Sequence, residues 1–196
     1  FGAETPYDFY CLHNVPNTMF TKIKCQDGTI ERADLSKMEF IPNGMYKEFE
    51  KLIAKDGEEK VKMIFDSSYH TQRDFVSKEQ TDVFKYPCID TVGKDCEYIK
   101  YFYTSRNDRG HFNVSKVIFS TGRSGSTIID KNGKYGLTQF AFAIVDEINN
   151  LEFIKRALDS DGFIKLMKFA DSINSQKYNR KVIATFRKDF WKEFLY

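Results

Sequence analysis

Short apolar runs separated by polar turn residues dominate the middle of the chain. Runs of this length, bounded by Gly, Pro, Ser, Asn or Asp, are typical of β-strands. We expect strands at residues 61–65, 83–86, 98–103, 116–119 and 137–145. The last two runs are the most continuously apolar, which predicts that they are buried.

The first 43 residues also have the pattern of strands and turns. Apolar or aromatic runs lie at residues 7–13, 20–24 and 29–32. The last two runs flank Gln26-Asp27-Gly28, and an Asp-Gly pair favours a tight hairpin because it tolerates positive φ values. We therefore expect a β-hairpin there, followed by a breaker cluster at residues 40–44.

Apolar residues recur at helical spacing in four segments: residues 45–54, 146–158, 163–170 and 180–195. Ser160 or Asp161 is placed to cap the third of these helices. The fourth has an apolar stripe opposite basic residues, which favours a helix packed on the sheet over one that reads DNA. The pattern predicts an α+β fold, a mixed and mostly antiparallel sheet with C-terminal helices packed on it.

A polar segment separates the runs at residues 116–119 and 137–145. It is dense in Gly, Ser, Thr, Asn, Lys and Arg. Because the segment is too polar for a core, we expect it to project outward with its backbone N–H groups, hydroxyls and cations. A rigid sheet presenting such a loop suits the binding of a polyanion or of a polar base edge.

The distribution of charge supports this interpretation more than the net charge of +2 does. Residues 98–139 contain seven Lys or Arg against two acids, and residues 151–196 contain ten against six. The remaining residues therefore sum to −7. A basic stripe on a nearly neutral domain is expected of a protein that binds a phosphate backbone, although a solvated Lys-rich surface gives the same count.

Composition further narrows the class of protein to which the chain can belong. The 196 residues suffice for a substantial core, and no apolar run approaches the roughly 18 residues of a membrane span. We expect no signal peptide at the start of the chain, and a start at Phe1 without Met suggests a piece of a longer protein. The four cysteines form no CxxC pair and the three histidines complete no zinc pattern. We expect reduced, mostly buried cysteines, no metal site and an intracellular, cytoplasmic protein.

Familiar catalytic motifs are missing from the chain. It contains no GxGxxG after a strand, no P-loop, no HExxH and no GxSxG. Two alternatives stay open beside a DNA-binding function. One is a small Mg-dependent nuclease of a restriction system, with Glu58 and Lys60 preceded by Asp34, or with His70 as an acid–base group. The other is a protein–protein interaction module with an aromatic-rich surface.

The order of segments in the second half resembles a known family. Lys116-Val-Ile-Phe, a Gly-rich excursion, Asp130-x-x-Gly-Lys-Tyr-Gly-x-Thr-Gln139 and an apolar strand precede a helical unit, Ile154-x-x-Ala-Leu-x-Ser160-x-x-Phe163. This order resembles the C-terminal target-recognition region of TaqI/Eco57I-like adenine-N6 DNA methyltransferases, found in restriction–modification systems and large DNA viruses. Residues 177–183 are similar to the closing segment of that region.

The resemblance divides the chain in two. Residues 60–196 correspond to the DNA target-recognition domain, and residues 1–59 to the linker at the end of a catalytic domain. The Gly-rich cofactor motif and the Asn/Asp-Pro-Pro-Tyr/Phe motif of these enzymes are both absent. The resemblance therefore implies a chain that binds double-stranded DNA without catalytic residues or a cofactor of its own. S-adenosylmethionine and methyl transfer would belong to a catalytic domain or subunit that is missing here.

Three groups of residues are the candidates for DNA contacts. Phosphates would be bound by Lys100, Arg106, Arg109, Lys116, Lys131 and Lys134. Base edges would be reached by Arg123, Ser124, Asn132 and Gln139, since Arg pairs well with guanine and Asn or Gln with adenine. A second polar loop would approach a groove with Tyr69, His70, Gln72 and Arg73. Each of these residues could instead serve only its turn or its neighbouring backbone.

Overall fold

The computed structural model describes residues 20–25, 28–120, 126–170 and 178–195. It confirms the α+β class, with antiparallel sheets and helices in the C-terminal part. The strands are β1 Thr21–Lys24, β2 Ile30–Ala33, β3 Lys62–Ile64, β4 Val76–Ser77, β5 Tyr86–Val92, β6 Ile99–Thr104, β7 Lys116–Ser120, β8 Thr127–Asp130, β9 Gly136–Leu137 and β10 Ala141–Val145. The α-helices are α1 Tyr46–Leu52, α2 Leu151–Asp159, α3 Asp161–Met167 and α4 Arg180–Ile183. Short 3₁₀ helices are η1 Leu35–Lys37, η2 Lys94–Cys96, η3 Ile148–Asn150 and η4 Phe190–Phe194.

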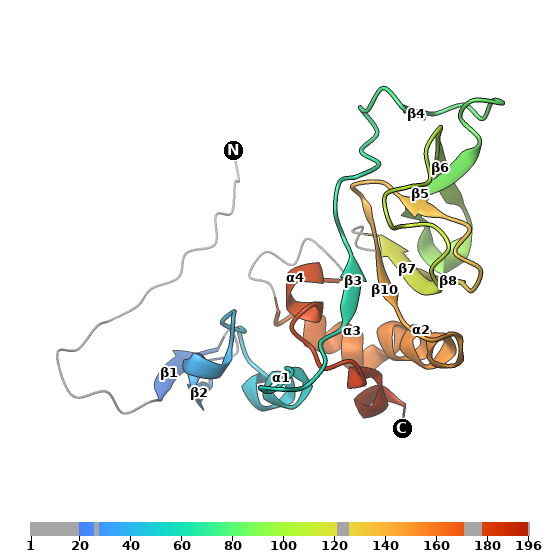
Figure 1. The fold of residues 1–196 in the computed structure, drawn as a ribbon. Helices are drawn as coiled ribbons and strands as arrows, with labels where there is room; N and C mark the ends of the chain where they lie inside the picture. Colours follow the sequence, from blue (N-terminus) through green and yellow to red (C-terminus); the bar gives the residue numbers. More distant parts are fainter. Residues whose placement is uncertain (1–19, 26–27, 121–125, 171–177, 196) are drawn as a thin grey trace, which may run out of the picture.

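Two four-stranded sheets form the body of the molecule (Figure 1). The first sheet has the order β3-β10-β7-β8, and the second has the order β4-β6-β5-β9. Neighbouring strands are antiparallel except for β5 and β9, which are parallel. A separate two-stranded sheet, β1-β2, supplies the hairpin expected near the N-terminus. The run at residues 7–13 lies outside the described residues, as do Gln26 and Asp27 of the hairpin turn.

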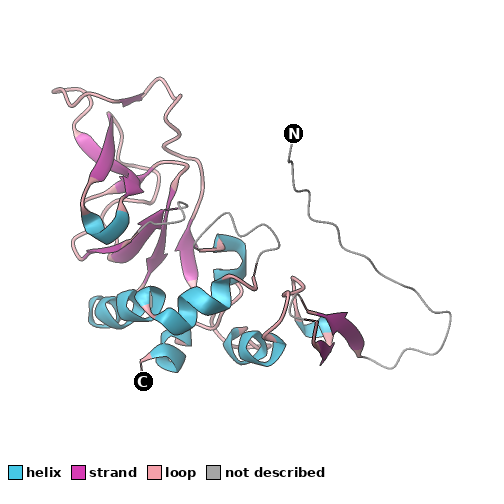
Figure 2. Cartoon of the chain, turned by 180° about the vertical axis from the view of Figure 1, so that it is seen from behind, coloured by secondary structure: helices cyan, strands magenta, loops and turns pink. Residues whose placement is uncertain are grey.

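The first sheet is covered on both faces. Along β7, Val117 and Phe119 belong to one core cluster and Ile118 to another, because successive side chains of a strand point to opposite faces. The helices α2 and α3 pack on the first of these faces, where they contribute Leu151, Ile154, Leu158, Phe163, Leu166 and Met167. In Figure 1, α2 and α3 lie together below the strands, and Figure 2 shows the same arrangement from behind. Burial of both faces explains why β7 reads as a continuous apolar run.

The second sheet packs against the other face of the first. The cluster between them joins Ile118 and Ala143 of the first sheet to Ile89 and Leu137 of the second. On the outer face of the second sheet lies a smaller aromatic cluster: Tyr69, Val76, Cys88, Phe102 and Phe112. The helices, the first sheet, the second sheet and the loops outside it thus form successive layers.

Residues 137–145, expected as one strand, form two strands in different sheets. β9 pairs with β5 in the second sheet, and β10 pairs with β3 and β7 in the first. The turn between them begins at the buried Thr138, whose hydroxyl donates to Asp90 at 2.8 Å. The single-strand prediction was therefore wrong, because hydrogen bonds to a distant strand interrupt the apolar run.

The polar segment before β9 is not wholly an outward loop. Its residues 127–130 form β8, which pairs antiparallel with β7. Thr127 is fully buried and Asp130 is 4% exposed. The expectation of an exposed segment was wrong for these residues, because each of the two polar side chains has a hydrogen-bonding partner inside the protein.

The strand expected at residues 83–86 begins later, at Tyr86, and runs to Val92. It includes Pro87, which pairs with Tyr103 of β6. On the other side, the register with β9 covers only Cys88 and Ile89. Proline is tolerated at this position because the strand has a neighbour on one side only.

The helix expected over residues 180–195 is broken. α4 ends at Ile183, and the chain then extends so that Phe186 bridges Ile53 and Arg187 bridges Lys60. Only the 3₁₀ helix η4 follows. Pairing with two distant segments overrides the helical spacing of the apolar residues.

The predicted cap of α3 is confirmed, since the Ser160 side chain accepts a hydrogen bond from the N–H of Phe163.

Helix α1, which precedes residue 60, is built into the same core. Phe49 and Leu52 of α1 lie in the cluster beneath the first sheet.

The described cysteines are free thiols: Cys25 and Cys88 are buried and Cys96 is exposed. Cys11 lies outside the described residues.

Candidate nucleic-acid interface

Three loops that are far apart in the sequence meet beside the second sheet. They are residues 66–75 after β3, residues 105–111 after β6, and residues 138–140 between β9 and β10; we call them together the three-loop surface. The amide of Gln139 joins the first loop to the third: its Oε1 accepts from the N–H of Thr71 at 3.1 Å, and its Nε2 donates to the Thr71 hydroxyl at 2.9 Å. The N–H of Arg109 donates to the Tyr69 hydroxyl at 3.0 Å and joins the first loop to the second.

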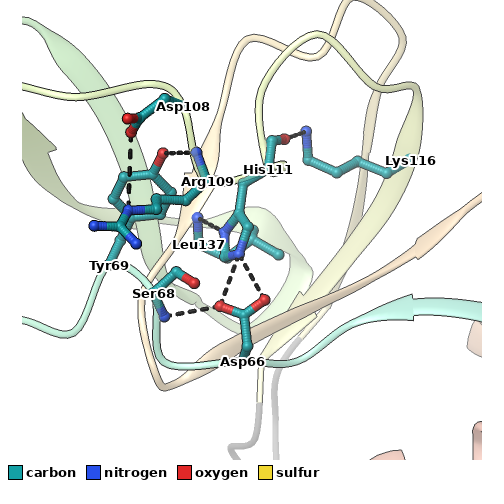
Figure 3. Close-up of polar contacts among 8 residues, drawn as sticks. All are labelled: Asp66, Ser68, Tyr69, Asp108, Arg109, His111, Lys116 and Leu137. Carbon is teal, nitrogen blue, oxygen red and sulfur yellow. Dashed lines mark hydrogen bonds and ion pairs between the residues drawn. The ribbon is translucent and has the colours of Figure 1, made fainter.

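His111 is the central polar residue beneath these loops (Figure 3). Its side chain is 1% exposed, and its Nε2 lies 3.0 and 3.1 Å from the two carboxylate oxygens of Asp66. Its Nδ1 lies 3.2 Å from the backbone nitrogen of Leu137, which can only donate. Nδ1 must therefore accept, which places the ring hydrogen on Nε2 and makes the imidazole neutral.

The environment of the pair agrees with this assignment. Burial lowers the pKa of His111 below its usual value, although Asp66 opposes the shift. Burial would raise the pKa of Asp66, but hydrogen bonds from Ser68 and the interaction with His111 hold it below its usual value. The pair thus combines a neutral imidazole with an ionised carboxylate.

Tyr69 lies inside this arrangement rather than at its surface. The residue is fully buried, and its ring meets those of His111 at 5.0 Å and Phe112 at 5.5 Å, measured between centroids. Burial raises the pKa of Tyr69 to about 12. The expectation that Tyr69 contacts DNA is corrected: its hydroxyl serves the backbone of Arg109.

Lys116 is also removed from the surface. Its side chain is 0% exposed, and its Nζ lies 2.7 Å from the Asp130 carboxylate. The same Nζ donates to the carbonyls of His111 at 2.9 Å and Val114 at 3.2 Å. Burial lowers the pKa of Lys116, while Asp130 opposes that shift. A phosphate cannot reach this ammonium, so the expected contact is wrong: Lys116 secures the segment between His111 and β7.

Exposed cations are nevertheless present on the three-loop surface. The guanidinium carbons of Arg106 and Arg109 lie 4.9 and 6.0 Å from the centroid of the same Phe75 ring. Arg73, two residues before Phe75, is exposed. Within the described residues, Arg73 and Arg106 form no ion pair, whereas Arg109 lies 3.9 Å from Asp108. Phe75 thus holds Arg106 and Arg109 of the second loop against the first loop, which also carries Arg73.

The polar residues expected to reach bases occupy different positions. Gln72 is exposed and His70 is partly exposed, with its Nδ1 accepting from the N–H of Gln72 at 3.2 Å. Gln139 is partly buried and both ends of its amide engage Thr71, so it positions a loop. Arg123 and Ser124 lie outside the described residues.

The turn between β8 and β9 carries a second group of candidates. Asn132 and Lys134 are exposed there, and Lys131 pairs with Glu152 of α2 at 3.6 Å. Gly133 fixes the turn: its φ is 65°, and a Cβ would lie 2.2 Å from the backbone nitrogen of Val114. Lys100, expected at a phosphate, pairs with the buried Asp90 at 3.0 Å while remaining 57% exposed.

Glu58 and Lys60, two of the nuclease candidates, lie away from the three-loop surface, which carries His70. Glu58 and Lys60 line an open cavity of about 1120 Å³ near α1, and His70 is not among its lining residues. Lys60 pairs with Glu39 at 3.0 Å, and the Glu58 carboxylate accepts from the N–H of Lys55 at 2.9 Å. Among the described residues, no three His, Cys, Asp or Glu side chains are grouped as metal ligands.

Several residues that organise the site were not anticipated from the sequence: Asp66, Asp90, His111, Asp130 and Thr138. A partial signal existed, because Lys116 and Asp130 are charged residues at the ends of apolar strands. Nothing in their spacing indicated which charges would pair.

Fold and site together define an α+β protein with two packed sheets and a loop surface that presents arginines on an aromatic ring. No protein-family model, no curated protein and no solved structure matches the chain. In the part of the chain that the structure describes, no helix is both long enough and apolar enough to cross a membrane.

Proposed function

We propose that this chain is the DNA target-recognition part of an adenine-N6 DNA methyltransferase or related restriction–modification enzyme. Two features support the proposal: the segment order that resembles TaqI/Eco57I-like recognition regions, and the three-loop surface. In this function the chain selects a site on double-stranded DNA inside the cell. A separate catalytic domain or subunit binds S-adenosylmethionine and transfers the methyl group.

The observation that carries the proposal is the placement of Arg106 and Arg109 over Phe75. An aromatic face restricts the freedom of a guanidinium and leaves its N–H groups available to a ligand. Two guanidiniums on one ring, with the exposed Arg73 on the same loop, suit the oxygens of a phosphodiester backbone.

The surface is not strongly basic. Arg73, Arg106 and Arg109 are matched in number by Asp66, Asp74 and Asp108. Asp66 accepts hydrogen bonds from His111 and Ser68, and Asp108 lies beside Arg109. Binding would therefore depend on where the arginines are placed more than on net charge, so we expect a small number of phosphate contacts and a moderate salt dependence.

Base recognition falls to polar residues of the same loops. Gln72 and His70 project from the same loop as Arg73, and the Gln139 amide holds that loop at Thr71. Asn132 and Lys134 provide a second contact region on the β8–β9 turn.

A binding experiment tests the arginine pair. The double variant Arg106→Gln/Arg109→Gln and a control, Lys47→Gln on the exposed surface of α1, would be titrated with a fluorescent duplex from 50 to 200 mM salt. Each lost phosphate contact should reduce the slope of log K against log salt by about 1, so the double variant should lose about 2. An unchanged affinity and slope in a folded double variant would remove the basis of the proposal.

A selection experiment tests sequence recognition. Duplexes enriched from a random library by the parent chain should share a site, and Gln72→Ala should relax the preference at one position by about tenfold or more. Equal retention of every sequence by the parent chain would show that it does not select a target.

A further inference from the structure

One imidazole connects all three loops of the surface. Asp66 begins the first loop, His111 ends the second, and Leu137 directly precedes the third. The His111 ring bonds to Asp66 through Nε2 and to the Leu137 N–H through Nδ1. The Gln139–Thr71 bonds join the first loop to the third and the Arg109–Tyr69 bond joins the first to the second, whereas the His111 ring links all three loops at once.

The two hydrogen bonds require a neutral ring. A neutral imidazole offers one N–H and one lone pair, which match the Asp66 carboxylate and the Leu137 N–H. Protonation places a second hydrogen on Nδ1, opposite the N–H of Leu137 at 3.2 Å. Two donors then face each other in a buried site, and the bond to β9 is lost.

The surrounding charges do not favour the imidazolium strongly. Asp66 attracts it, but that carboxylate is 55% exposed and is shared with Ser68. The ammonium of Lys116 repels it from the other side while donating to the His111 carbonyl and pairing with Asp130.

The remaining neighbours are neutral near physiological pH. The Tyr69 ring meets the imidazole edge to face, and the Tyr69 pKa is about 12. The Cys88 thiol, which interacts with Tyr69 and Lys116, is protonated as well, because burial raises its pKa to about 12. Neither group can compensate a second positive charge beside Lys116.

We propose that proton uptake by His111 releases the three-loop surface, so that the surface is assembled at neutral pH and opens in mild acid. In an opened form the ring is solvated and binds protons with its ordinary pKa of about 6.5. The closed form resists protonation, so each pH unit below about 6.5 raises the open fraction up to about tenfold, until the closed form is itself protonated. This switch is independent of what the surface binds.

Nuclear magnetic resonance on the ¹⁵N-labelled chain tests the switch directly. At pH 7.5 the His111 ring should carry its hydrogen on Nε2, and the Leu137 amide should be protected from hydrogen exchange. Below about pH 6.5 the Leu137 protection factor should fall by up to about tenfold per pH unit. The variant His70→Asn, which removes a histidine of the same surface, serves as the control and should leave this response unchanged.

A second variant separates the switch from general acid unfolding. Asp66→Asn keeps an oxygen that can accept from Nε2 but removes the charge that attracts the proton. The closed form of this variant resists protonation further, so Leu137 protection should begin to fall at the same pH of about 6.5 but should keep falling to a lower pH than in the parent chain. The control Asp74→Asn, exposed on the same loop, should leave the pH response unchanged. A hydrogen on Nδ1 at pH 7.5, or Leu137 protection that is constant from pH 7.5 to 5, would overturn the proposal.

Duplex binding at the same pH values distinguishes this inference from the proposed function. Loss of Leu137 protection in a chain that binds no DNA at any pH would support the switch and count against DNA recognition. DNA binding by a chain whose Leu137 protection is unaffected by pH would support DNA recognition and count against the switch.

Discussion

At the scale of single residues, Lys116 shows how completely a buried charge can be satisfied. Its three ammonium hydrogens have three acceptors: Asp130 and the carbonyls of His111 and Val114. Asp130 in turn accepts from the N–H groups of Lys134 and Tyr135. The pair thereby fixes the backbone on both sides of the β7–β8 hairpin.

Removal of this ammonium should be strongly destabilising. Lys116→Met leaves the Asp130 carboxylate buried without its cation, and we expect the free energy of unfolding to fall by about 3–5 kcal/mol. Urea denaturation provides the measurement. The exposed control Lys47→Met should change stability by no more than about 0.5 kcal/mol, and an equally small effect of Lys116→Met would contradict the buried pair.

The cysteines should differ in reactivity. Burial raises the pKa of the Cys88 thiol to about 12, so almost no thiolate is present at pH 8, whereas Cys96 is exposed. With a maleimide reagent and peptide mass mapping, Cys96 should be labelled in the folded chain and Cys88 only after unfolding. Equal rates at the two thiols would show that the second sheet opens readily.

At the scale of elements, the junction of α2 and α3 depends on one hydroxyl. The Ser160 Oγ accepts from the N–H of Phe163 at 3.2 Å and donates to the Ala157 carbonyl at 2.7 Å. Ser160→Ala removes both bonds, and we expect a loss of about 1 kcal/mol. Ser160→Asp, which keeps an N-cap acceptor, should recover part of this loss in thermal unfolding; full stability in Ser160→Ala would exclude a capping role.

The same scale shows what the sequence could predict. β6, β7 and the capped start of α3 lie within about a residue or two of their expected positions, because local periodicity and capping determine them. Residues 180–195 did not follow their helical spacing, since Phe186 and Arg187 pair with segments near Ile53 and Lys60. Such pairing depends on contacts more than a hundred residues away and leaves no periodic signal.

The candidate site, too, could be predicted only in part from the sequence. The loops with Arg73 and Arg106 were recognisable as polar and basic, but their meeting at Phe75 follows from tertiary structure. Tyr69 and Lys116 were assigned to DNA because their residue types suit it. Their burial depends on partners that sequence spacing does not reveal, namely Arg109 and Asp130.

At the scale of the whole molecule, the free energy of unfolding should decrease in two steps as the pH is lowered. The folded-state pKa of His111 is lowered, so its contribution is present at neutral pH and is lost as pH falls below the unfolded value of about 6.5. The pKa of Asp66 is lowered too, so its contribution is present above about pH 3.8 and is lost as pH falls through the folded value.

Urea midpoints measured between pH 7.5 and 3 should reveal both steps. Asp66→Asn should leave the onset of the first step near pH 6.5 but extend that step to lower pH, because the folded-state pKa of His111 falls further, and it should weaken the second step. A midpoint that is constant from pH 7.5 to 5 would contradict the neutral, buried state of His111.

The parallel pairing of β5 and β9 also determines the order in which the chain can fold. Asp90 and Thr138 are 48 residues apart in the sequence, and Thr71 and Gln139 are 68 apart, so each contact closes a long loop. The β5–β6 hairpin is local and can form early. During synthesis neither long-range contact is possible until Gln139 has left the ribosome. The nascent chain therefore carries a preformed hairpin and an unassembled three-loop surface until β9 arrives.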